Sequence, residues 1–317
     1  MSFESPEHQK PFDQWFEEEY QKREIVALEH GQTKVLDIRP EHSKSERPLL
    51  IASGYGSGSP TGVKANIAEL VRLGRRTMMI EAPHGLPHTI TDERAAEMPE
   101  TFKREIAALI PTLEKKHIDK VDAIGQSAGC IRIIMAAYLY PEKFKNIVLV
   151  DPGGMIGEDT PARLTFRFIK DAIATGFKVA KRASSLSNVE REQRKETPPE
   201  FMHYVLEDRK TTMREVKDLA RAEIHGLLRS VKDHGIGISI IHGVDDAVFP
   251  MERINPDPEK NPDPKKSILL SSEDLDGFYS VRGGHAELSI NPEQYTQAAE
   301  RALSALEEKQ ERSNASM

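Results

Sequence analysis

Residues 121–140 read VDAIGQSAGCIRIIMAAYLY, an apolar run that stops at Gly125, carries Ser127 between two glycines and resumes with helical spacing. This pattern is typical of a short buried strand, a sharp turn and a helix. A corner of this kind needs small residues two positions before and after its centre, because the strand and the helix nearly touch there. Gly125 and Gly129 satisfy that need. Ser127 is therefore either a small turn residue or a nucleophile raised above the end of a sheet.

The sequence on both sides of this stretch alternates strands and helices. Between residues 48 and 154, apolar runs such as PLLIAS, TMMIEA and FKNIVLVD are separated by segments with helical spacing. Short buried strands alternating with helices predict an α/β fold, with a mostly parallel central sheet flanked by helices. Two further strands are expected before residue 40, around a turn at His30 and Gly31.

The alternation pauses after residue 154 and resumes with GIGISIIHGVDDAVFP at 235–250. The charged segment between these points has helical character, so we expect it to be a helical cap inserted into the core. The predicted organisation is a polar N-terminal extension (1–22), a core (23–154 and 236–308), the cap (155–235) and a disordered tail (309–317).

Composition restricts the classes of partner. The 317 residues carry a net charge of −7, which argues against DNA or an anionic membrane as the main partner. No segment has the roughly 18 apolar residues of a membrane span, and the N-terminus lacks the pattern of a signal peptide. We therefore expect a cytoplasmic protein with no membrane span and no nucleic-acid partner. The sequence is compatible with a homodimer.

A serine hydroxyl is a poor nucleophile at neutral pH, so Ser127 would need a histidine base oriented by an acid. His285, in VRGGHAE, follows the last predicted strand. Asp245 and Asp246 follow the strand before it. Strand ends are where such groups would converge, and the chain order serine, aspartate, histidine is a known arrangement.

With these motifs the chain resembles the α/β-hydrolase superfamily, in its serine-nucleophile branch of esterases and lipases, over roughly residues 24–307. In that family the acid often lies in a G-x-x-D pattern followed four residues later by proline, as in GVDDAVFP at 243–250. The resemblance favours Asp246 over Asp245. Some members place the acid after an earlier strand, which leaves Asp151 as an alternative.

The resemblance also implies an oxyanion hole made of two backbone N–H groups. Ala128 would supply one, and Tyr55 the other, with Gly56 as the alternative. The family usually has His-Gly in this loop, whereas this chain has Ser-Gly-Tyr-Gly at 53–56. Gly54, Gly56 and Gln126 are expected to contact the substrate. Apolar cap residues could form a wall of the pocket: Phe166, Ile169, Phe177, Met202, Tyr204 and Val205.

Cofactor and metal sites are not expected. The stretch LLIASGYGSGSPTG at 49–62 is similar to a dinucleotide-binding fingerprint, but Ser59 stands at its third glycine position. Cys130 is the only cysteine, so a cysteine-based zinc site is excluded. His84 and His88 lie on a proline-rich loop with spacing poorly suited to a metal.

The resemblance implies a carboxylesterase-like serine hydrolase that acts on a small-molecule acyl substrate through Ser127, His285 and Asp246. A serine nucleophile excludes the aspartate-based haloalkane dehalogenases and epoxide hydrolases of the superfamily. Two alternatives stay open. One is a C–C hydrolase or acyltransferase on the same triad, and the other is a catalytically silent small-molecule receptor.

Overall fold

The computed structural model describes residues 11–54, 60–81, 90–157, 159–181, 187–254, 270–271, 273–285 and 291–315. Within these residues, eight strands form one sheet in the order β1-β2-β4-β3-β5-β6-β7-β8. β2 pairs antiparallel with β1 and β4, and the other neighbours are parallel. The predicted α/β fold with a mostly parallel sheet is confirmed. The strands are β1 (Glu24–Leu28), β2 (Gly31–Ile38), β3 (Leu49–Ala52), β4 (Thr77–Ile80), β5 (Val121–Gln126), β6 (Phe144–Val150), β7 (Gly237–Gly243) and β8 (Gly277–Val281).

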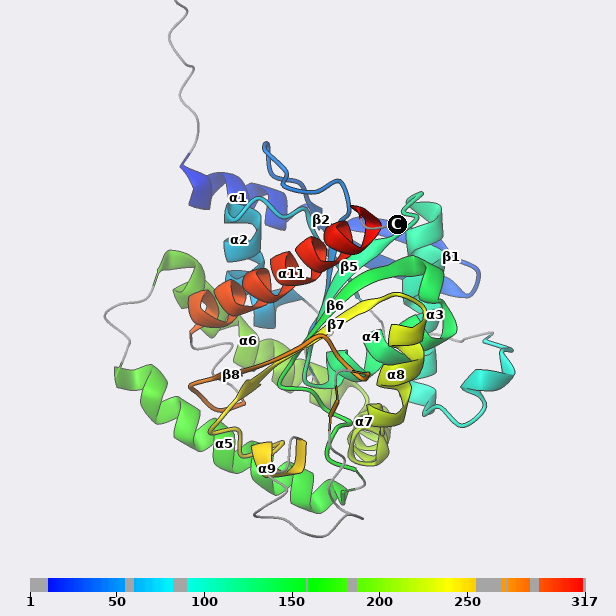
Figure 1. The fold of residues 1–317 in the computed structure, drawn as a ribbon. Helices are drawn as coiled ribbons and strands as arrows, with labels where there is room; N and C mark the ends of the chain where they lie inside the picture. The colour runs from blue at the N-terminus through cyan, green and yellow to red at the C-terminus, as the bar shows by residue number, and fades with distance from the viewer. Residues whose placement is uncertain are drawn as a thin grey trace, which may run out of the picture.

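Helices cover both faces of the sheet (Figure 1). One face carries α1 (Phe12–Tyr20), α2 (Lys64–Arg72) and α11 (Pro292–Ala315). The other carries α3 (Glu100–Lys115), α4 (Ala128–Leu139) and α8 (His225–Asp233). Because both faces are covered, every residue of β3, β4 and β7 is buried, which explains their nearly continuous apolar sequences. Short 3-10 turns η1 (Pro60–Val63), η2 (Glu93–Ala95) and η3 (Pro141–Lys143) lie in the connections.

The segment between β6 and β7 is helical, with α5 (Pro161–Lys181), α6 (Asn188–Glu207), α7 (Arg209–Arg221) and then α8. Ser187 and Glu190 form a capping box at the start of α6. α8 packs against α4 and β7, with Leu228 and Val231 fully buried, whereas α5 and α7 add single residues such as Leu164 and Leu219 to the same cluster. The segment between β6 and β7 therefore supplies α8, which lies against the sheet, as well as α5, α6 and α7. A short helix, α9 (Met251–Ile254), follows β7.

Helices extend into both of the terminal segments that the sequence marked as polar, over residues 12–20 and up to residue 315. Helix α1 buries Phe16 and Tyr20, so part of the expected polar extension packs onto the core. The prediction of a disordered tail from residue 309 is wrong for residues 309–315, which continue α11. No glycine or proline interrupts this part of the helix. Its side chains also pair, Lys309 with Asp276 at 2.6 Å and Arg312 with Glu308 at 3.1 Å.

Among the helices of the described residues, none combines the length and the apolar character needed to cross a membrane.

Candidate active site

Ser127 occupies the corner between β5 and α4, at the carboxyl edge of the sheet. Its backbone has φ 52° and ψ −118°, a strained conformation for a residue with a side chain. Hydrogen bonds on both sides hold it there: its N–H donates to Val150 O at 3.0 Å, and its carbonyl accepts from Cys130 N and Gly153 N, both at 3.1 Å. The strained conformation is therefore held by β6, by the loop that follows it and by the first turn of α4.

The two glycines of the G-x-S-x-G motif permit close backbone contact. A Cβ atom on Gly129 would lie 2.0 Å from Ala52 O, and one on Gly125 would lie 2.8 Å from Cys130 Cα. Any larger residue would push α4 away from β3 or from its own strand. The sequence at this corner thus holds the first turn of α4 directly against the neighbouring strand.

Asp246 and His285 reach Ser127 from the loops that follow β7 and β8. His285 Nε2 lies 3.0 Å from Ser127 Oγ, and His285 Nδ1 lies 2.9 Å from Asp246 Oδ2. The three residues are buried, with exposed fractions of 3%, 4% and 5% for Ser127, Asp246 and His285. Because β5, β7 and β8 run in the same direction, their carboxyl ends share one edge of the sheet, which is where ligands bind in open α/β sheets.

The structure resembles solved structures with very different sequences. It aligns with a hydrolase from Pseudomonas aeruginosa PA01 at a TM-score of 0.58 and 13% identity, over 89% of this chain and 98% of that one. It aligns with the enol-lactonase from Burkholderia xenovorans LB400 at a TM-score of 0.59 and 11% identity, over 89% of this chain and 100% of that one. It aligns with a thermophilic esterase from Thermogutta terrifontis at a TM-score of 0.56 and 17% identity, over 90% of this chain and 99% of that one. The chain has the α/β-hydrolase fold. No protein-family model matches the sequence, and no curated protein matches it.

The Asp246 carboxylate is held in one orientation. While Asp246 Oδ2 faces His285, Asp246 Oδ1 accepts hydrogen bonds from the N–H groups of Val248 at 2.7 Å and Phe249 at 2.9 Å. Burial acts to raise the pKa of Asp246, but the charge of His285 and these hydrogen bonds outweigh it and lower the pKa. The lowered pKa favours the ionised form of Asp246, which accepts a hydrogen bond from the Nδ1–H of the imidazole.

The imidazole is correspondingly basic. Burial acts to lower the pKa of His285, but the negative charge of Asp246 and its hydrogen bond raise the pKa above the usual 6.5. An ionised Asp246 at Nδ1 favours the tautomer that leaves Nε2 free to accept a proton. Nε2 is the nitrogen that faces Ser127, so the arrangement suits removal of the serine proton.

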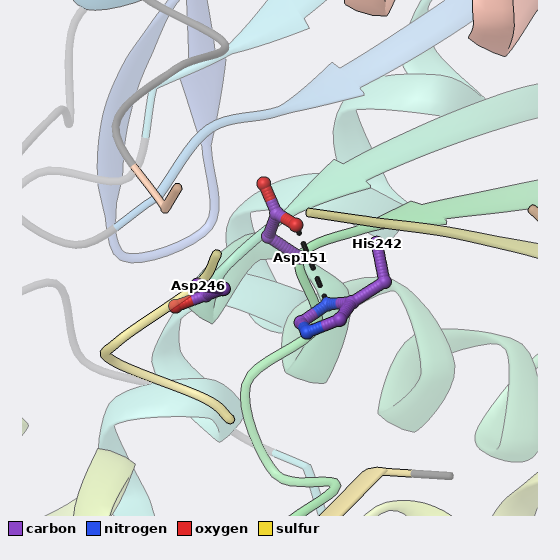
Figure 2. A group of neighbouring side chains, drawn as sticks. All are labelled: Asp151, His242 and Asp246. Atoms are coloured by element: carbon purple, nitrogen blue, oxygen red, sulfur yellow. Dashed lines mark ion pairs between the residues drawn. The ribbon is translucent and has the colours of Figure 1, made fainter. Parts of the chain in front are cut away.

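Asp151 forms a second buried pair behind this group, with His242 (Figure 2). Its Oδ1 accepts from Gly243 N at 2.7 Å and lies 3.3 Å from His242 Nδ1, and both side chains are fully buried. Burial and the charge of Asp246 raise the pKa of Asp151 to about 8. His285 bonds to Asp246 instead, so the geometry favours Asp246 over Asp151 as its acid. Asp245, the other alternative, is exposed.

Asp151, His242 and Asp246 also meet the distance requirement for a metal site, since their ligand atoms lie within 4.8 Å of one another. Both oxygens of Asp246 already accept hydrogen bonds from His285, Val248 and Phe249. A cation would have to displace these donors, so the group fits an imidazole partner better than a metal.

Three of the residues expected to bind the oxyanion and substrate, Gly54, Gln126 and Ala128, lie next to Ser127 at the end of β5 or close to it. Ala128 is the first residue of α4, where N–H groups have no acceptor within the helix. Gln126 is the last residue of β5. Gly54 follows β3, and a Cβ atom on it would lie 3.2 Å from Ser127 Cβ. Tyr55 and Gly56 are outside the described residues, so the second donor stays a prediction.

Sequence reasoning missed two aromatic rings that flank the imidazole. The ring centroids of Phe168 and Phe249 lie 5.4 Å and 5.1 Å from that of His285, at interplanar angles of 80° and 75°. Phe168 comes from α5, in the segment expected to be a cap. The spacing of Leu164, Phe168 and Asp171, which marks one helix face, could have identified it.

The expected apolar wall of the pocket is wrong for three of its residues. Phe166, Ile169 and Met202 are exposed by 68%, 54% and 52%. On α5, the inward face is the one that carries Phe168, so the two predicted residues on either side of it point elsewhere. The side chains of Phe177, Tyr204 and Val205 lie outside the described part of the chain.

Proposed function

We propose that this protein is a serine hydrolase that cleaves an ester or related acyl bond of a small molecule. The observation that carries the proposal is the continuous path from Ser127 Oγ through both nitrogens of His285 to Asp246 Oδ2, with separations of 3.0 and 2.9 Å. It is supported by a serine on a strained corner at a helix N-terminus. The names of its structural neighbours, which include a hydrolase, an esterase and an enol-lactonase, agree with this class.

The reaction would proceed through an acyl-enzyme. Ser127 Oγ attacks the substrate carbonyl while His285 Nε2 takes its proton, and Asp246 stabilises the resulting imidazolium. In this proposal the tetrahedral oxyanion is bound by the N–H groups of Ala128 and Tyr55, each worth about 3 kcal/mol in the transition state. His285 then protonates the leaving group, and water attacks the acyl-enzyme with the same base. No step requires a cofactor, and we expect the reaction to take place in the cytoplasm.

The test is hydrolysis of p-nitrophenyl acetate and butyrate, together with labelling by a fluorophosphonate. Wild type should turn over and be labelled, and Ser127→Ala should lose both, with activity falling by about 10⁴-fold or more. Ser239→Ala is the matched control, because Ser239 is a buried serine within β7, away from the strand end. It should stay close to wild type.

Each alternative predicts a different result. A receptor would show neither turnover at any acyl length nor labelling. An acyltransferase would give a transfer product when an alcohol acceptor is added, and a C–C hydrolase would spare simple esters while still being labelled. Equal turnover by wild type and Ser127→Ala would contradict the nucleophile.

A further inference from the structure

Helix α5 presents two different faces. Leu164, Phe168 and Asp171, spaced by four and three residues, lie on the face that packs inward. Leu164 is 1% exposed and Asp171 7% exposed. The opposite face is open to solvent and carries Phe166, Ile169 and Ile173. The rotation of α5 about its axis is therefore set by contacts with the core, and those contacts include the candidate active site.

Phe168 completes an aromatic enclosure around His285. Its ring meets the imidazole at 80° and meets Phe249 at 85°, with centroids 6.4 Å apart in the second case. Edge-to-face contacts of this kind are attractive and directional. Phe249 belongs to the loop that holds Asp246, whereas Phe168 comes from the inserted helices. The imidazole is thus clamped between two parts of the chain that lie about 80 residues apart.

Asp171 lies one turn further along the same face, against the backbone that leads into His285. A Cβ atom on Gly284 would lie 3.0 Å from Asp171 Oδ1, so the carboxylate occupies the space a side chain would need there. Four ionisable groups surround the imidazole: Asp246 in the loop after β7, Asp151 at the end of β6, His242 on β7, and Asp171 on α5. The negative charges of Asp246 and Asp171 raise the pKa of His285, and Asp171 is the only one of these four groups that comes from the helices between β6 and β7.

We propose that Phe168 and Asp171 are positioning residues for His285, so that the seating of α5 on the core sets the orientation of the imidazole and the charge beside it. The inserted helices would then control the reactivity of Ser127 as well as covering it. This inference rests on the proposed function for its kinetic tests, but not for its spectroscopic one.

The first test removes the Phe168 ring. Phe168→Leu should lower the rate of fluorophosphonate labelling and kcat for p-nitrophenyl butyrate by about tenfold, with KM changed less than about twofold. Phe168→Tyr keeps a ring and should recover most of the loss. Phe166→Leu is the matched control, two residues away on the exposed face, and should behave as wild type. Equal rates for Phe168→Leu and Phe166→Leu would overturn the role of the ring.

The second test follows the imidazole itself. The pKa of His285, measured by NMR in otherwise wild-type protein, should fall by about 0.5 pH unit in Asp171→Asn, because a nearby negative charge is removed. Asp233→Asn, at an exposed site on α8, should leave it unchanged. An unshifted His285 pKa in Asp171→Asn would overturn the role of this carboxylate.

The two proposals can fail separately. A wild-type protein that is neither labelled nor active contradicts the proposed function, and the NMR titration still decides the role of Asp171. An active wild type whose Phe168→Leu and Asp171→Asn variants match their controls contradicts only the inference about α5.

Discussion

Replacing Gly129 by alanine should separate the helix from the sheet at the serine corner. The new Cβ would start 2.0 Å from Ala52 O, 2.6 Å from Ala52 C and 2.7 Å from Ser53 O. Non-bonded contacts of a Cβ atom are essentially never shorter than 3.0 Å, so α4 and β3 must move apart by at least 1 Å. All three obstructing atoms are backbone, and β3 is held by parallel pairing to both β4 and β5. No side chain can rotate away to relieve the overlap.

The cost follows from this geometry. One extra methyl group in a packed core usually costs 1–3 kcal/mol, and a rigid backbone obstacle puts this case at about 3–5 kcal/mol. Alanine gains at most about 1 kcal/mol of helix propensity over glycine, which does not offset it. With a urea m-value of about 3 kcal/mol/M, the unfolding midpoint should fall by about 1 M or more.

Gly226 provides the matched control. Like Gly129 it is the second residue of a helix, but a Cβ atom there would meet only Glu223 Oε2 at 3.5 Å. Gly226→Ala should therefore keep or slightly raise the midpoint in the same urea titration, followed by circular dichroism. If the two variants unfold at the same urea concentration, the close approach of α4 to β3 does not constrain residue 129.

Three further predictions concern the buried ionisable groups. Asp246→Asn should lower kcat for p-nitrophenyl butyrate by about 10³–10⁴-fold, because the imidazole loses the acceptor that orients it. Asp151→Asn should lower kcat far less. If Asp151→Asn caused the larger loss, Asp151 would be the acid. The proposed base, His285, has a raised pKa and must be neutral to act, so kcat/KM should rise with pH with a midpoint above 6.5. A midpoint below 6.5 would contradict the effect of the neighbouring carboxylates on His285. Asp151 stays protonated up to about pH 8 when folded but ionises near 3.8 when unfolded, so the wild type loses stability as pH rises between these values. Asp151→Asn should remove that loss and raise the free energy of unfolding at pH 7 by up to about 4 kcal/mol, with little effect at pH 4. Urea titrations at several pH values would measure this, and a gain that does not grow with pH would refute the prediction.

The fold was predictable because its signals are local. Each buried strand is a short apolar run, and the corner at Ser127 is marked by two glycines whose spacing has a steric cause. The order of Ser127, Asp246 and His285 at strand ends was also visible, and these side chains do lie within hydrogen-bonding distance. Their catalytic roles, and that of Tyr55, remain predictions.

What sequence reasoning missed depends on contacts between distant segments. Phe166 and Ile169 were expected to line the pocket because they are apolar. The orientation of α5 is instead set by Leu164 and Asp171, which pack on the core. A charged residue on the inner face, close to His285, is the opposite of what hydrophobic patterning suggests. The helical tail was missed for a related reason, since Lys309 pairs with Asp276 in another part of the chain.

The sheet order also has a consequence for synthesis of the protein. β5 and its serine lie in the middle of the sheet, whereas β7 and β8 are added beyond β6 at the edge and come late in the chain. Ser127 and His285 are 158 positions apart. On a translating ribosome, where domains fold from the N-terminus, the corner at Ser127 can form before His285 has been synthesised. Under the proposed function, a nascent chain would not hydrolyse esters until β8 has emerged and docked.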